Sequence, residues 1–167
     1  MGLRRRSFVL VSLVAPLAGC GFHLRQAPKF AFESLYLSSA EGSGLGNELR
    51  RNLAAAGTLR VLGRQEPPAN ADVLLDLLEE RREKVVVARS STGQVREFQL
   101  RIRVRFRLRT PQGRELIPDT ELVQQRDISF NESAVLAKEA EENLLYRDMQ
   151  TDLVQQILRR LAAVKAL

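Results

Sequence analysis

The chain is poor in the residues that most often carry chemistry. It has no tryptophan, one cysteine and one histidine among 167 residues, and aromatic residues make up 5% of it. This composition argues against a carbohydrate-stacking platform and an RNA-binding sheet, because both depend on exposed aromatic rings. The one histidine, His23, has no nucleophile–base pair near it in the sequence. No metal-ligand spacing, phosphate-binding loop or catalytic triad is present either, so we expect no cofactor and no enzymatic activity.

The single cysteine lies in an N-terminal segment with the layout of a secretory signal. Three arginines at positions 4–6 come first, and an uncharged, mostly apolar run follows over positions 8–17. That run is too short to cross a bilayer as a stable helix. The segment ends in Leu17-Ala18-Gly19-Cys20, which resembles the lipobox of bacterial lipoproteins.

This resemblance implies that residues 1–19 are a signal peptide and that Cys20 becomes the acylated first residue of the mature protein. Several acyl chains would anchor it far more firmly than one, and no thiol would remain for a disulfide or a metal site. Cleavage would remove three arginines and no acidic residue, which lowers the formal net charge from +6 to +3. The basic pI therefore does not indicate a nucleic-acid partner. The alternative is an ordinary signal peptide with a chance cysteine.

The mature part has the size of one domain with one core. We interpret residues 20–33 as a lipidated, extended tether, since Pro28 blocks a helix there, and residues 34–167 as a single domain. Residues 34–38 alternate as in a short strand. Leucines then recur at helical spacing over 45–53, and Gly57 offers a C-terminal stop. The glycines before this helix, at positions 42, 44 and 46, do not fit a dinucleotide-binding fingerprint and predict a strand-to-helix turn.

Three long runs joined by two turns follow, over residues 72–89, 95–109 and 115–128. The turns lie at residues 90–93 and 110–113, and the second has the Pro and Gly positions of a type I turn. Long runs joined by tight turns predict an antiparallel meander.

The last segment predicts one long amphipathic helix. No Gly or Pro occurs between Ser133 and Val164, and apolar residues recur at a spacing of four from Leu145 to Leu161. Together these elements predict an α+β fold, a two-layer sandwich. Its sheet is small and mostly antiparallel, with about four strands, and is covered by two helices of which the second is long and C-terminal.

The run over residues 95–109 carries an arginine ladder. Five apolar residues alternate with five arginines, so the arginines share one face of a strand and the apolar residues share the other; the arginines are Arg101, Arg103, Arg105, Arg107 and Arg109. One interpretation is a set of cross-strand ion pairs, with Glu79 near Arg105 and Glu83 near Arg101 if the 90–93 turn is tight. The other is a docking face for an anionic ligand or an acidic partner surface.

Several segments, in order, resemble the LptE family of lipopolysaccharide-assembly lipoproteins. The resemblance begins at Cys20-Gly21-Phe22-His23-Leu24-Arg25 and continues at the 93–99 hairpin tip and at Leu136-Ala137-Lys138-Glu139. It extends to Met149 and to residues 156–161, and so covers nearly all of the mature chain. The fold that it implies, a small sheet packed by two helices, agrees with the one expected above.

The resemblance implies a non-catalytic protein, lipid-anchored on the periplasmic side of the outer membrane. Such a protein forms a heterodimer with the LptD β-barrel, sits as a plug in its lumen, helps it assemble and binds lipopolysaccharide. Two basic positions are associated with lipopolysaccharide binding in the family. One matches Lys138; the other aligns near Ser91, and here Arg89 and Arg96 flank the tip and are candidates to substitute. The competing hypothesis is a lipid-anchored accessory subunit of another envelope transporter or assembly machine.

Overall fold

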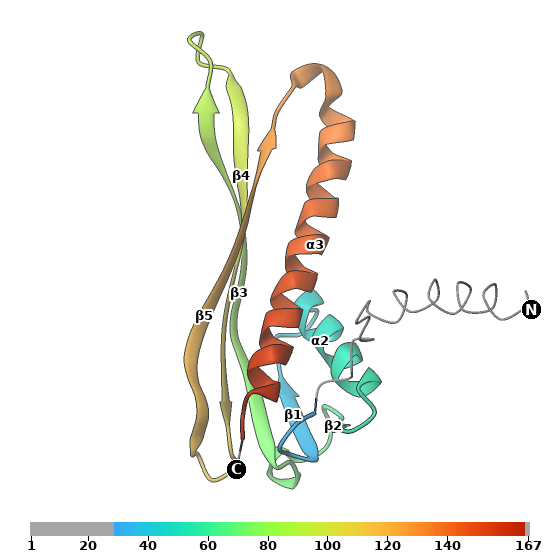
Figure 1. Cartoon of the computed structure of the whole chain (residues 1–167). Helices are drawn as coiled ribbons and strands as arrows, with labels where there is room; N and C mark the ends of the chain where they lie inside the picture. The colour runs from blue at the N-terminus through green and yellow to red at the C-terminus, as the bar shows by residue number, and fades with distance from the viewer. Residues whose placement is uncertain (1–28, 166–167) are drawn as a thin grey trace, which may run out of the picture.

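The computed structural model describes residues 29–165 (Figure 1), and the lipobox, Cys20 and His23 lie outside them. Its elements, in chain order, are β1 (Ser34–Ser38), α2 (Gly44–Ala55), β2 (Arg60–Leu62), a 3-10 turn (Pro68–Asn70), β3 (Val73–Arg89), β4 (Val95–Arg109), β5 (Glu115–Ser129), a second 3-10 turn (Glu132–Ala134) and α3 (Val135–Ala162).

The strands form one five-stranded sheet in the order β2-β1-β3-β4-β5. The three long strands are antiparallel to one another, whereas β1 pairs in parallel with both β2 and β3. Figure 1 shows β3, β4 and β5 running the length of the molecule beside α3, with β1, β2 and α2 gathered at the end opposite the β3–β4 turn. The predicted α+β fold is confirmed, and the sheet has one strand more than expected.

The strand that the sequence analysis missed is β2, which is three residues long. These three residues do not form a long alternating segment between two turns, which is the pattern that predicts a strand. They are extended because residues 60–62 pair with residues 34–36 of β1. The last residues of the expected tether, within the described part of the chain, pack against the domain. Phe32 is 3% exposed in the core and its ring stacks on Phe30 at a centroid distance of 5.4 Å.

A bulge in β3 decides which side chains face the helices. Leu77 lies opposite Phe106 of β4, but the next regular pair joins Glu79 to Arg105, so Leu78 is an extra residue. One extra residue reverses the alternation of side chains between the two faces. Beyond the bulge, the positions of β3 opposite the buried residues of β4 are therefore Glu80, Arg82 and Lys84, and Val86 lies opposite the partly buried Phe98.

The short helix α2 begins and ends where the sequence predicts. Ser43 caps its N-terminus, because the side-chain oxygen accepts from the Gly46 backbone N–H at 2.8 Å. A Cβ on Gly46 would come within 2.8 Å of the Ser39 hydroxyl, so close packing requires glycine there. Gly57 ends the helix at a φ of 70°, a left-handed conformation that glycine adopts readily.

The long helix α3 has 28 residues, which corresponds to about 42 Å. It begins after a 3-10 turn in which the Asn131 side chain accepts from the Ser133 N–H at 3.0 Å. Two arginines in its last turn, Arg159 and Arg160, complement the negative end of the helix dipole.

The core lies between the sheet and the two helices. The five apolar residues of β4 that alternate with the arginines are each at most 1% exposed, as that alternation predicts; they are Leu100, Ile102, Val104, Phe106 and Leu108. Facing them, α3 buries the row Met149, Leu153, Ile157 and Leu161, each 0% exposed. The opposite face of β4 carries the arginine ladder.

A candidate anion-binding pocket at the hairpin end

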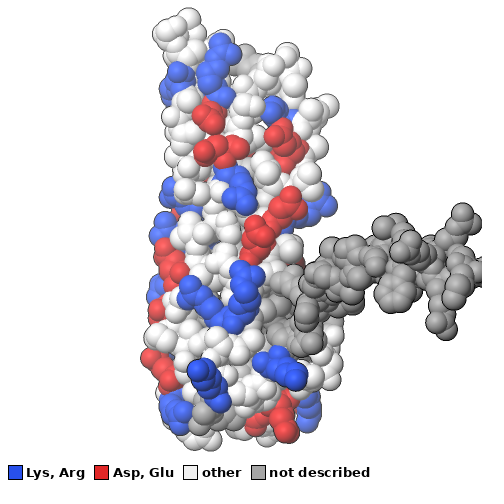
Figure 2. All heavy atoms as spheres, viewed as in Figure 1, with Lys and Arg blue, Asp and Glu red and all other residues white. Residues whose placement is uncertain are grey.

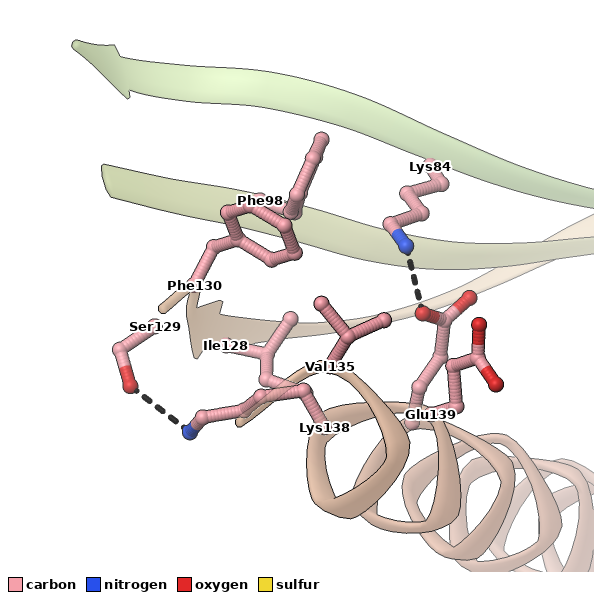
Figure 3. A pocket seen from close by; sticks show the side chains of 9 residues that line it. Lys84, Phe98, Ile128, Ser129, Phe130, Val135, Lys138 and Glu139 are labelled. Atoms are coloured by element: carbon pink, nitrogen blue, oxygen red, sulfur yellow. Dashed lines mark hydrogen bonds and ion pairs between the residues drawn. The ribbon is translucent and has the colours of Figure 1, made fainter. Parts of the chain in front are cut away.

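A small pocket lies where α3 begins, between its first turns and the ends of β4 and β5 (Figure 3). Its floor is apolar and is formed by Phe98, Ile128, Phe130 and Val135. The Phe98 and Phe130 rings meet edge to face, with centroids 5.3 Å apart. The cavity measures about 60 Å³, which is room for about two waters or one small ionic group.

Lys138 is one of two cations that line this pocket. Its ammonium donates to the Ser129 hydroxyl at 2.9 Å and pairs with Glu141 at 2.9 Å. Figure 3 shows the side chain reaching from α3 back to the end of β5. Its side chain is 22% exposed, less than the 48% of Glu141. The sequence-predicted basic position thus lies in a pocket and contacts solvent only in part.

The second cation is Lys84 of β3, which sequence reasoning missed. Its ammonium lies 4.4 Å from the centroid of the Phe98 ring and pairs with Glu142 at 2.6 Å. The contact with the ring face is a cation–π interaction. No local pattern in the sequence indicates Lys84, because it faces the helices only after the Leu78 bulge, which is a feature of the pairing between β3 and β4.

Arg96 and Arg89 lie near the pocket but do not line it. Arg96 lines a neighbouring hollow at the start of β4, and the two cavities share Phe130. Arg89 is at the turn itself, where its guanidinium donates to the Gly93 carbonyl at 3.1 Å. The structure therefore places Lys138 and Arg96 in two cavities that share Phe130, and it holds Arg89 on the hairpin tip.

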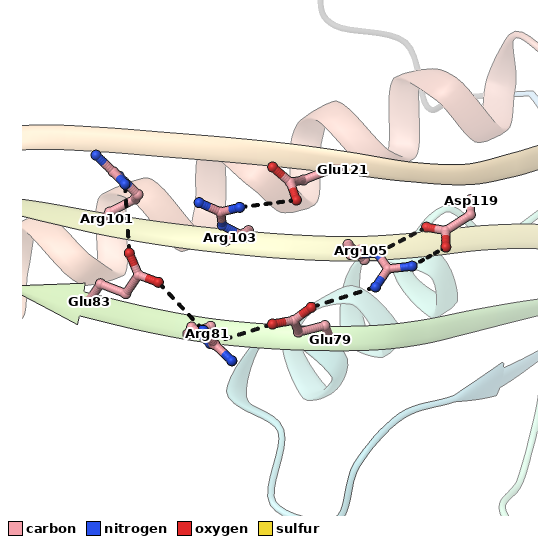
Figure 4. Close-up of polar contacts among 8 residues, drawn as sticks. All are labelled: Glu79, Arg81, Glu83, Arg101, Arg103, Arg105, Asp119 and Glu121. Atoms are coloured by element: carbon pink, nitrogen blue, oxygen red, sulfur yellow. Dashed lines mark hydrogen bonds and ion pairs between the residues drawn. The ribbon is translucent and has the colours of Figure 1, made fainter.

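The arginine ladder lies on the face of the sheet that the helices do not cover, and acidic neighbours compensate it (Figure 4). Arg101 pairs with Glu83 at 3.7 Å and Arg105 with Glu79 at 3.8 Å, the two predicted pairs. Arg105 also pairs with Asp119. The hydrogen bond and the charge of Asp119 raise the pKa of the Arg105 guanidinium above its usual value.

The rest of the ladder is paired as well. Arg103 reaches Glu121 at 3.3 Å, and Arg107 and Arg109 both donate to one oxygen of Asp76 at 2.9 Å. Asp76 is only 8% exposed, so the two guanidiniums satisfy a nearly buried carboxylate. On the face shown in Figure 2, basic and acidic side chains are likewise interspersed along the molecule. A partner for the ladder face would therefore meet alternating charges, and each anionic ligand would have to displace a carboxylate.

Residues 29–165 hold neither a cluster of metal-binding side chains nor a membrane-spanning helix. No group of three or more His, Cys, Asp or Glu side chains within that range is arranged to hold a metal ion. No helix in the same range is both long and apolar enough to cross a membrane.

The comparisons with known proteins agree with the sequence resemblance. The model of the LptE lipopolysaccharide-assembly family matches residues 32–161. A protein of Pectobacterium atrosepticum named LPS-assembly lipoprotein LptE is 28% identical over 170 residues, which cover 97% of this chain and 88% of that protein.

Solved structures give the same result for the fold. The solution structure of lipoprotein B from Nitrosomonas europaea is 36% identical with a TM-score of 0.72, and the match covers 86% of this chain and 91% of that one. The crystal structure of rare lipoprotein B from Shewanella oneidensis is 23% identical with a TM-score of 0.66, over 78% of this chain and 95% of that one. At that lower identity, the second match supports the fold alone.

Proposed function

The chain belongs to the LptE lipopolysaccharide-assembly family, and from this we propose that it is a non-catalytic outer-membrane lipoprotein that binds lipopolysaccharide and plugs the LptD β-barrel. Residues 1–19 are removed, and acylated Cys20 holds the domain at the periplasmic side of the outer membrane. The related LptE of Pectobacterium atrosepticum supports this role by its name and by its match over nearly the whole chain.

The observation that carries the ligand part of the proposal is the position of Lys138. Its side chain lines an apolar pocket floored by Phe98 and Phe130, and Arg96 lines a second cavity that shares Phe130. A cation beside an apolar surface suits an amphipathic anion, because phosphate accepts charge-assisted hydrogen bonds from ammonium and guanidinium groups while apolar groups are buried nearby. Lys138 and Arg96 therefore bind the phosphates of lipid A, and Arg89 extends the basic region to the hairpin tip.

The barrel-plug part of the proposal is supported by the charge pattern of the sheet. The uncovered face presents paired charges of both signs from residue 76 to residue 121. Such a face remains hydrated and does not require an apolar partner, which is consistent with the polar interior of a transmembrane barrel. The alternative, an accessory subunit of another envelope machine, shares the anchor and the domain but predicts a different partner.

A double charge reversal tests the ligand site. Lys138→Asp with Arg96→Asp should weaken binding of lipopolysaccharide by at least about a hundredfold, since two charge-assisted contacts become two repulsive ones. The fold should remain intact, because both side chains lie outside the core and an acidic residue suits the first turn of a helix. Binding is measured with purified lipopolysaccharide, and recovery of the barrel is measured by pull-down.

A matched control reverses two exposed arginines far from the hairpin, Arg51→Asp with Arg64→Asp, and so makes the same change in net charge. The control should bind lipopolysaccharide normally. If the site variant bound lipopolysaccharide like the control but lost the barrel, Lys138 and Arg96 would belong to the partner interface. If the wild-type protein recovered no large β-barrel, the proposed partner would be wrong.

A further inference from the structure

Lys84 and Lys138 line one pocket, yet each is neutralised by a carboxylate of α3. The Lys84 ammonium pairs with Glu142 at 2.6 Å, and the Lys138 ammonium pairs with Glu141 at 2.9 Å. Glu139 and Glu142 also line the pocket itself. Carboxylates of the protein itself therefore pair with both cations of the pocket.

These internal ion pairs are easy to exchange. The Lys84 side chain is 38% exposed and that of Glu142 is 21% exposed, and partly exposed Lys–Glu pairs stabilise a fold only weakly. A ligand phosphate carries more charge than a carboxylate and has more acceptor oxygens, so it competes well for the same ammonium. Lys84 would keep its contact with the Phe98 ring when it changes partner, because the ring lies 4.4 Å away on β4.

We propose that Lys84 is the second phosphate-binding cation of the Lys138 pocket and that Glu142 is an internal competitor that occupies Lys84 until the ligand binds. This proposal rests on the proposed function and adds a residue and a regulatory contact to it. The size of the pocket also indicates which part of the lipid enters it. A cavity of about 60 Å³ takes one phosphate group, while acyl chains remain outside, next to Leu136, which is 82% exposed.

Two single substitutions with opposite expected signs test the proposal. Lys84→Gln removes a ligand contact and should weaken binding about tenfold. Glu142→Gln removes the competitor and should strengthen binding roughly threefold. Arg82→Gln is the matched control. Arg82 lies two residues from Lys84 on the same face of β3, but its guanidinium contacts Tyr146 and Gln150 and does not line the pocket. The Arg82→Gln variant should bind lipopolysaccharide with an affinity within about twofold of that of the wild type.

Binding is measured with the full-length lipoprotein in detergent, titrated into fluorescent lipopolysaccharide. Parallel titrations use dephosphorylated lipopolysaccharide as the ligand and inorganic phosphate as a competitor. Thermal unfolding of each variant checks that the fold is intact. Dephosphorylated ligand should bind Lys84→Gln and wild type equally. Inorganic phosphate alone should compete poorly, because it lacks the apolar part of the ligand.

The outcomes separate this inference from the proposed function. If the wild type does not bind lipopolysaccharide, the proposed function fails. The wild type could bind lipopolysaccharide while both variants weaken binding or neither changes it. In that case the Lys84–Glu142 ion pair has only a structural role between β3 and α3, and the inference about Lys84 is wrong while the proposed function stands. Competition by free phosphate as strong as by lipopolysaccharide would overturn the assignment to a phosphorylated lipid.

Discussion

Phe106 and Arg103 are near neighbours on β4 but lie on opposite faces, and truncating each of them tests the packing of the sheet. Phe106 is 0% exposed and lies opposite Leu77 of β3 and Thr120 of β5. Phe106→Ala would leave a cavity under the helices, and such a truncation costs roughly 3–5 kcal/mol of unfolding free energy. For a domain of about 150 residues this corresponds to a fall in Tm of roughly 6–20 °C.

Arg103→Ala should cost much less. Its guanidinium reaches Glu121 at 3.3 Å with 35% of the side chain exposed, and a pair of this kind contributes at most about 1 kcal/mol. Urea titration of both variants and the wild type, followed by circular dichroism, gives the two free energies. Equal destabilisation would refute the assignment of faces. A changed m-value, the slope of the unfolding free energy against urea, would show that the mutation altered the compactness of the unfolded or folded state, or broke two-state unfolding.

Two further predictions concern the lipid anchor and the contact that joins Asp72 to the start of β1. Cys20→Ser should block processing and leave a precursor of higher mass, whereas an unmodified thiol on the mature protein, detected by mass spectrometry, would contradict lipidation. Asp72 links β1 to β3. Burial would raise the pKa of its carboxyl, but the Glu33 and Ser34 backbone N–H groups, each 2.9 Å away, and the Ser34 side chain outweigh burial and lower it. A lowered pKa in the folded state stabilises the fold above the unfolded value of about 3.9, and this contribution is lost as the pH falls through the folded value. Asp72→Asn should therefore reduce stability at pH 7 and flatten its acid dependence below about pH 4; an unchanged acid dependence of the unfolding free energy would show that the contact is unimportant.

Much of this architecture follows from local patterns in the chain. The alternation along β4 fixes which face is buried, because successive side chains of a strand point to opposite sides. The turn at residues 90–93 then sets the register, so that Glu79 meets Arg105 and Glu83 meets Arg101. The spacing of four along α3 fixes its buried row in the same way. Resemblance to a known family, carried by short motifs, drew attention to Lys138, which lines the pocket.

Other features depend on contacts that no local pattern encodes. β2 is a strand only because β1 lies beside it, and three residues have too few local interactions to be extended by themselves. Asp76 meets two arginines because strand pairing brings residues 31 and 33 positions apart together. Lys84 enters the pocket because the Leu78 bulge reverses the faces of β3, and the choice of a bulge depends on how the whole strand fits against β4 and the helices. The sequence by itself thus determined the long elements, the buried faces of β4 and α3, and the family. The tertiary structure decided the short strand β2, the face that β3 presents beyond its bulge, and which charged groups share a pocket.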